Sequence, residues 1–221
     1  MSRRAVYTAL AISMFAFRAT GAQQPLTPLT ADAEANAQLT SIVSATREAG
    51  LPIQPILSKV RYAVVVAHAP APTVVAAARA IASRLVASRE ALAPQPSDLD
   101  IAAGADALGV VGVETKSLKA IRAVSPKHSV VVPLGVLAQL VSSRVPASKA
   151  TDIVTELMKR GASPQQLVAL GNNVNSDVAS GENAAKALDV RFRGLNAVLA
   201  PGASPAAADL PGAALTGPKK P

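Results

Sequence analysis

The sequence contains no cysteine and no tryptophan, and it has only two histidines. Without cysteine the chain forms neither disulfides nor a lipid-anchored N-terminal cysteine, so its stability has to come from an apolar core. Aromatic residues make up 2% of the chain, too few for the stacking surfaces that bind saccharides or single-stranded nucleic acid. These shortages exclude several classes of site before any motif is considered.

The positive charge is concentrated at the two ends of the chain. The net charge is +8, but Arg3, Arg4 and Arg18 lie within the first 22 residues, and removing that segment leaves +5. Residues 191–221 contribute a further +3 of this excess, so 23–189 carries only +2. A sequence pI near 10.2 therefore does not indicate a basic surface on the fold, and we expect no nucleic-acid partner.

Residues 1–22 have the pattern of an export signal. Basic Ser2-Arg3-Arg4 precedes the uncharged run Ala5–Phe17, and Thr20-Gly21-Ala22 offers small residues for cleavage. The run is shorter than the roughly 20 apolar residues that span a bilayer. We expect cleavage after Ala22 and a periplasmic or fully secreted protein with no transmembrane anchor. The two arginines also loosely resemble a twin-arginine export motif, although ordinary secretion is the preferred interpretation.

Residues 32–190 are predicted to form one all-α domain. Alanine is abundant, and apolar residues recur at spacings of three and four, as on one face of a helix. Runs of valine at 130–132 and 64–66 are the best alternative strand pair, because β-branched residues favour strands. Helices are expected near 32–49, 53–68, 72–85, 98–111, 114–124, 129–142, 147–160, 164–179 and 183–189.

Similar turns separate these helices. Gly50, Gly112, Gly161 and Gly181, and Arg144 in the place of a glycine, each end one helix shortly before the start of the next. Their irregular spacing predicts a succession of short helical hairpins, either an irregular helical array or a solenoid-like bundle. Proline-broken residues 23–31 are expected to be a linker, and 191–221, rich in Ala, Pro and Gly, a disordered tail.

Few residues are candidates for chemistry. His68 and His128 lie apart from other potential ligands, and structural roles are expected for both. Asp152 and Glu156 share a helix face at i, i+4, but Lys149, Lys159 and Arg160 surround them, so a solvated face is more plausible than acid–base catalysis.

The segment Asn172–Asp177 is the most polar cluster. Asn173, Asn175 and Asp177 imitate the first ligands of a calcium loop, but Val178 replaces the required glycine and no glutamate closes the loop. No G-x-S-x-G elbow occurs, and the glycines at 109 and 112 lack the strand and the lysine–serine pair of a phosphate loop. We therefore assign no catalytic, cofactor-binding or metal-binding residue.

Three segments carry a resemblance to other proteins. Residues 48–60 (Glu48-Ala49-Gly50-Leu51-Pro52 followed by Ile56-Leu57-Ser58-Lys59-Val60), Val132–Leu140 and Asp177–Gly181 resemble exported α-helical proteins of bacteria that have no assigned activity. The resemblance covers roughly residues 45–181. It implies a helical fold and export, and it brings no functional residue with it.

Two functions remain open from the sequence. The first is a non-catalytic exported protein that presents a helical surface to another protein of the cell envelope. The second is an enzyme or small-ligand binder with a site assembled between hairpins. Association with a membrane surface through 53–66 or 133–141 is weaker, because the second segment has no basic polar face. We predict that Leu157→Asp unfolds the helix expected at 147–160 and that deleting 199–221 leaves stability intact.

Overall fold

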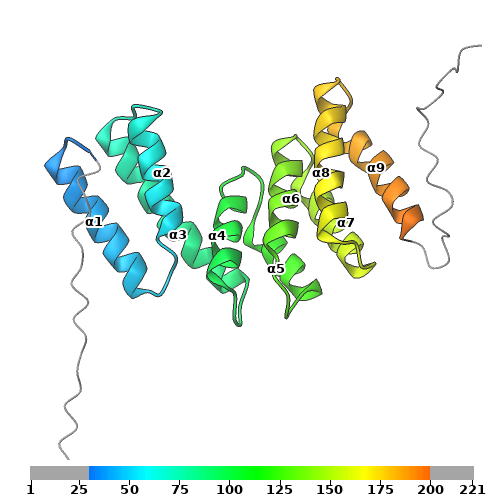
Figure 1. Ribbon diagram of the computed structural model, residues 1–221, viewed down its shortest axis with the longest axis horizontal. Coiled ribbons are helices and arrows are strands. Elements are labelled where there is room, and N and C mark those ends of the chain that lie inside the picture. The colour runs from blue at the N-terminus through cyan, green and yellow to red at the C-terminus, as the bar shows by residue number, and fades with distance from the viewer. Residues whose placement is uncertain (1–29, 200–221) are drawn as a thin grey trace, which may run out of the picture.

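The computed structural model describes residues 30–199, which form nine α-helices and no strand. The all-α prediction is confirmed, and each helix lies near its expected position, although α3 and α9 extend further than expected. They are α1 (Ala33–Glu48), α2 (Gln54–Val65), α3 (Ala71–Ala91), α4 (Asp98–Ala107), α5 (Thr115–Val124), α6 (Val131–Ser142), α7 (Ala147–Lys159), α8 (Pro164–Ala179) and α9 (Ala184–Val198) (Figure 1).

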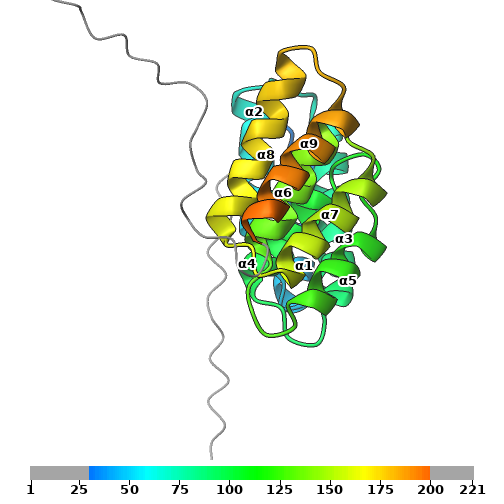
Figure 2. The same cartoon turned by 90° about the vertical axis from the view of Figure 1, so that its right-hand side faces the viewer.

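The helices stack side by side into an elongated array of two layers. In one layer α4 packs against α6, and α6 against α8; in the other α3 packs against α5, and α5 against α7. The end-on view in Figure 2 places α4 and α8 on one side and α5 and α7 on the other. The long helix α3 also contacts α1, α2 and α4, so it is the main connection of the N-terminal half.

The predicted turns between hairpins have the backbone that helix C-caps require. Gly50, Gly161 and Gly181 have positive φ, and so does Arg144, which occupies the equivalent place after α6. At Arg144 the amide of Val145 donates to the carbonyl of Leu140, the long-range bond of a Schellman motif. A left-handed conformation at a non-glycine residue is costly, so the turn after α6 is held by its surroundings.

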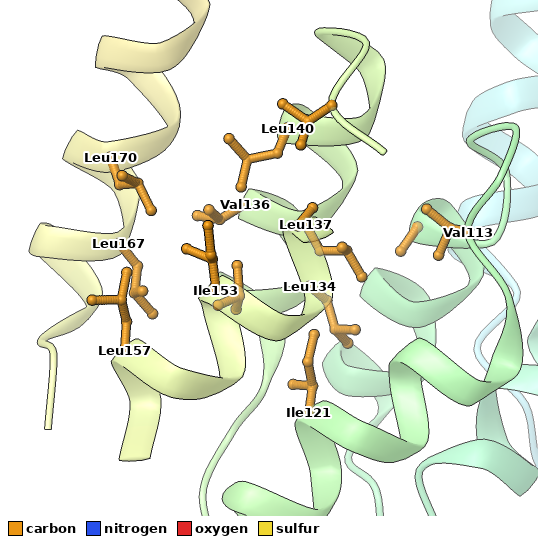
Figure 3. Close-up of a cluster of buried hydrophobic side chains, with 14 of the residues drawn as sticks. Val113, Ile121, Leu134, Val136, Leu137, Leu140, Ile153, Leu157, Leu167 and Leu170 are labelled. Carbon is orange, nitrogen blue, oxygen red and sulfur yellow. The ribbon is translucent and has the colours of Figure 1, made fainter. Parts of the chain in front are cut away.

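Two groups of buried side chains fill the space between the layers. The N-terminal group joins α1, α2 and α3 with Ile101 and Ala105 of α4. The larger C-terminal group, part of which is drawn in Figure 3, extends from the end of α3 to α9. Leu137 and Leu157 are fully buried in it, and each such leucine contributes about 1.5–3 kcal/mol through removal from water.

Two alternatives from the sequence are wrong at the level of local structure. Valines 130–132 do not form a strand, because α6 begins at Val131 and Val130 is completely buried beneath it. Valines 64 and 65 likewise belong to α2. The helix penalty of a β-branched residue is only a fraction of a kcal/mol. Partial burial of Val132 in α6 and of Val64 in α2 against the two cores offsets it, whereas Val65 is exposed and continues α2 at this small cost.

The expected end of the domain at residue 190 is also wrong. Helix α9 continues to Val198, and Phe192, Leu195 and Leu199 pack against the C-terminal core. These residues follow Leu188 at spacings of four, three and four, which is a helical pattern. Deleting 199–221 would therefore remove one core contact, Leu199, and the cut that spares the core comes after it.

The N-terminal linker reaches at most to residue 29. Thr30 is tied to α1, because the side-chain amide of Asn36 donates to the Thr30 carbonyl at 2.7 Å. The predicted signal peptide 1–22, the rest of the linker and tail residues 200–221 lie outside the described residues. Within 30–199 no helix is long and apolar enough to cross a membrane.

Candidate functional site: a groove between α2 and α4

The two histidines lie in separate turns. His68 follows α2 with a φ of 48°, and His128 precedes α6, where its carbonyl accepts a hydrogen bond from Nη1 of Arg122 at 3.0 Å. Across the described part of the chain, no three His, Cys, Asp or Glu residues come together as potential metal ligands. Both histidines are exposed.

The carboxylate pair on α7 is a solvated face, as predicted. Glu156 accepts from Nε of Arg160 at 2.7 Å, an i, i+4 pair with both side chains about 40% exposed. Asp152 is exposed. Neither carboxylate is buried, and the two do not share a partner.

The polar cluster on α8 does not converge on a common point. The side-chain oxygen of Asn175 accepts from Ser143 of α6, whereas Asp177 accepts two bonds of 2.7 Å from Arg191 of α9. The hydrogen bonds from Arg191 hold the pKa of Asp177 below its usual value, and the same bonds raise the pKa of Arg191. Val174 is fully buried beneath the cluster. These polar groups connect helices and do not form a calcium loop.

The most deeply buried ion pair of the described residues joins α4 to the end of α5. Oδ2 of Asp100 lies 3.2 Å from Nη2 of Arg122, and the two side chains are only 6% and 9% exposed. Arg122 also donates to the carbonyls of Ser125 and His128, which close the loop before α6. Asp100 therefore fixes the path of the chain from α5 to α6.

Asp100 also caps its own helix. It forms a capping box with Ser97 at the start of α4 and accepts from the amide of Val130 at 2.8 Å and the hydroxyl of Ser129 at 3.0 Å. Burial acts to raise the pKa of this carboxyl, but the hydrogen bonds from Val130, Ser97 and Ser129 outweigh it, so the pKa is lowered. The carboxylate stays ionised and structural.

A large hollow in the described residues is a groove between α2 and α4. Both helices pack against α3 but make few contacts with each other, so part of α3 is left uncovered between them. The resulting groove has a volume of about 960 Å³. Its floor includes Ile81 and Arg84 of α3.

The two walls of the groove carry unusually exposed apolar side chains. Tyr62 on the α2 wall is 54% exposed, and Leu99 on the α4 wall is 72% exposed. Val65 and Val66, at the end of α2 beside Tyr62, are 63% and 59% exposed. Large side chains of this kind are normally buried, and a group of them beside a hollow is typical of a surface that binds a partner.

Arg84, on the groove floor, has a side-chain nitrogen without a partner among residues 30–199. Its side chain is half-buried, and its Nε is shielded from solvent without a hydrogen bond to any described residue. Asp98 and Asp106 line the same groove, yet neither forms an ion pair with it. The guanidinium lies against the backbone of Gly109, where a Cβ would collide with its Nη1. Arg84 is thus held in the groove without a counter-charge from the described chain.

A second hollow, between α6 and α8, has a different character. It encloses about 480 Å³, and its lining includes Ser143 and Asn175, which hydrogen-bond to each other across it at 3.1 Å. Nearby, the amide of Gln139 donates to Asn172 at 3.1 Å. Three of its polar side chains, those of Gln139, Ser143 and Asn175, are thus already paired, and no large exposed apolar side chain lines this hollow as Tyr62 and Leu99 line the α2–α4 groove.

Comparison with known proteins adds no further assignment. No protein-family model matches the chain, and neither a curated protein nor a solved structure matches it. The site is therefore defined by its geometry: an apolar groove with an unpaired arginine at its floor. Sequence reasoning missed it because Tyr62, Arg84 and Leu99 belong to three helices and form no local motif.

Proposed function

We propose that this chain is a non-catalytic protein of the cell envelope that binds another protein in the α2–α4 groove. The observation that carries the proposal is the interruption of one helical layer, which uncovers α3 between walls bearing exposed Tyr62 and Leu99. Helical arrays commonly bury one face against their neighbours and leave another for a partner. The export pattern of residues 1–22 supports an envelope location.

Site-specific photocross-linking tests the proposal. A photoreactive amino acid is placed at Tyr62, at Leu99 or, as a control, at Val168, which is 42% exposed on α8 at the other end of the array. In cells that export the protein, positions 62 and 99 should give the same protein adduct and position 168 should not. Equal adducts from all three positions, or none from 62 and 99, would contradict the proposed groove.

The export part of the proposal has its own test. The mature protein recovered from the envelope fraction should begin at Gln23, which N-terminal sequencing would show. A chain that retains Met1 in the cytoplasmic fraction would remove the envelope from the proposal while leaving the groove in place.

A small-ligand binder is the second candidate. The volume of about 960 Å³ falls near the upper end of small-molecule sites, which combine apolar walls with a few polar groups. Native mass spectrometry of the purified protein distinguishes a small ligand from a protein partner. A small molecule that co-purifies with the protein, and that is absent from a variant in which a larger side chain fills the groove, would favour a small ligand over a protein partner.

A further inference from the structure

We infer that the occupant of the α2–α4 groove is an amphipathic helix of the partner protein, and that an Asp or Glu on its apolar face pairs with Arg84. The inference rests on the proposed function and adds the chemistry of the partner. It is argued from the charge at the groove floor, from the layer geometry and from the size of the groove.

The charge of Arg84 calls for an acceptor from outside the described chain. A half-buried guanidinium with a shielded, unpartnered Nε loses hydration without gaining a hydrogen bond. The shielded Nε is out of an occupant's reach, so a carboxylate would accept two bonds from the Nη groups of Arg84, which lines the groove. Asp98 and Asp106 stay on the α4 wall without pairing with it, so the carboxylate is assigned to the occupant.

The wall charges favour an occupant of mixed charge. Arg47 and Lys59 stand on the α1–α2 side of the groove, and Asp98 and Asp106 stand on the α4 side. A helix lying between them can place a carboxylate at the floor and oppositely charged groups toward the two rims. A uniformly acidic or basic occupant would meet like charge on one wall, which is unfavourable.

A helix also suits the layer in which the groove lies. Elsewhere in this layer α4 packs directly against α6, and α6 against α8, whereas between α2 and α4 the contact is largely lost. The groove volume of 960 Å³ equals that of a helical segment about 10 Å in diameter and about 12 Å long. A helix of that length has roughly eight residues. The flanking helices have 12 and 10 residues, so an inserted segment of two to three turns would lie alongside both.

Selection from a phage-displayed library of 16-residue amphipathic helical peptides tests the inference on the purified protein. The library varies the apolar face over apolar, acidic, amide and basic residues. Three targets are compared: the unaltered protein, Arg84→Met, and Arg79→Met as a control. Arg79 lies on the same helix, outside the groove, and contacts Gln38. Circular dichroism verifies that all three targets are folded.

The expected result is an acidic residue enriched at one apolar-face position on the unaltered protein and on Arg79→Met, and lost on Arg84→Met. For a selected peptide, Glu→Gln should weaken binding to the unaltered protein about tenfold and leave binding to Arg84→Met unchanged. Equal acid enrichment on all three targets, preference for extended proline-rich peptides, or no selected peptide would overturn the inference.

Failure of this inference is distinguishable from failure of the proposed function. Photocross-links from positions 62 and 99 without any acid preference in the selection would keep the groove as the binding site and remove the role of Arg84. Cross-links absent from both positions would remove the groove itself.

Discussion

Nη2 of Arg122 lies 3.2 Å from Oδ2 of Asp100, an ion pair that joins the first turn of α4 to the last turn of α5 with both side chains almost completely buried. Breaking a buried pair by removing one charge is far more costly than its surface equivalent, because the remaining charge stays desolvated. The pair and its hydrogen bonds also determine where α6 begins. It is therefore the polar contact whose loss should be most visible.

Asp100→Asn should lower the free energy of unfolding by about 3–5 kcal/mol at pH 7, since Arg122 would remain buried without its counter-charge. The pKa of Asp100 is lowered by folding, so the stability it supplies is present above its unfolded pKa of about 3.9 and is lost as the pH falls through the folded value. The difference in the free energy of unfolding between the unaltered protein and Asp100→Asn should therefore become smaller below about pH 4.

Urea unfolding at several pH values measures this effect. Asp152→Asn is the matched control, because Asp152 is exposed on α7 and forms no ion pair with the described residues. If the difference in the free energy of unfolding between the unaltered protein and Asp100→Asn stays constant from pH 7 to pH 3, the charge of Asp100 is not the source of that difference.

Gly104→Ala should destabilise the protein by about 1–3 kcal/mol, because a Cβ there would collide with the hydroxyl of Ser88 and crowd Leu92 and Leu118. Ser88 cannot give way freely, since its hydroxyl donates to the carbonyl of Ile101 at 2.9 Å. Gly135→Ala is the control within a helix: nothing lies within 4 Å, and a gain of about 0.5–1 kcal/mol is expected. Thermal melts of the two variants should shift in opposite directions.

Leu157→Asp should abolish cooperative unfolding or cost several kcal/mol, because it places a charge where Leu157 is fully buried between α7 and its neighbours. Val168→Asp, on exposed α8 surface, should change the melting temperature little. Far-UV circular dichroism during heating compares them. An unchanged melt for Leu157→Asp would contradict the arrangement of the C-terminal core.

Arg84→Met should stabilise the protein without a partner by about 1 kcal/mol, because it removes a half-buried charge that has no counter-charge in the described chain. Arg89→Met, also on α3, should be neutral or destabilising, since Arg89 donates to the carbonyl of Ala49 at 2.7 Å. A residue that costs stability while lining a groove is typical of a binding site. A loss of stability in Arg84→Met would indicate that Arg84 supports the fold.

The helices and their turns could be read from the sequence because those signals are local. Apolar spacing fixes the helix faces, and Gly50, Gly161 and Gly181 mark turns that only a few residue types tolerate. The end of α9 could have been found the same way, from the spacing of Leu188, Phe192 and Leu195. It was obscured because the Ala, Pro and Gly content beyond 198 dominates the composition of the whole C-terminal stretch.

The Asp100–Arg122 pair and the α2–α4 groove could not be predicted because they depend on tertiary packing. The sequence indicates Asp100 only as part of a helix cap, since nothing local relates it to a residue 22 positions away. The groove arises because α2 and α4 fail to pack together, and Arg84 lies in the middle of a helix with an ordinary sequence. Its missing partner is visible only once all the neighbouring helices are placed.

The most direct test of the groove as the binding site is to fill it and follow the cross-link from position 62. Ala102, on the α4 wall, is replaced by arginine, and Ala179, which lines the α6–α8 hollow, receives the same change as a control. Ala102→Arg should abolish the adduct while leaving the thermal melt unchanged, and Ala179→Arg should retain it. An adduct that persists in a folded Ala102→Arg protein would contradict the account.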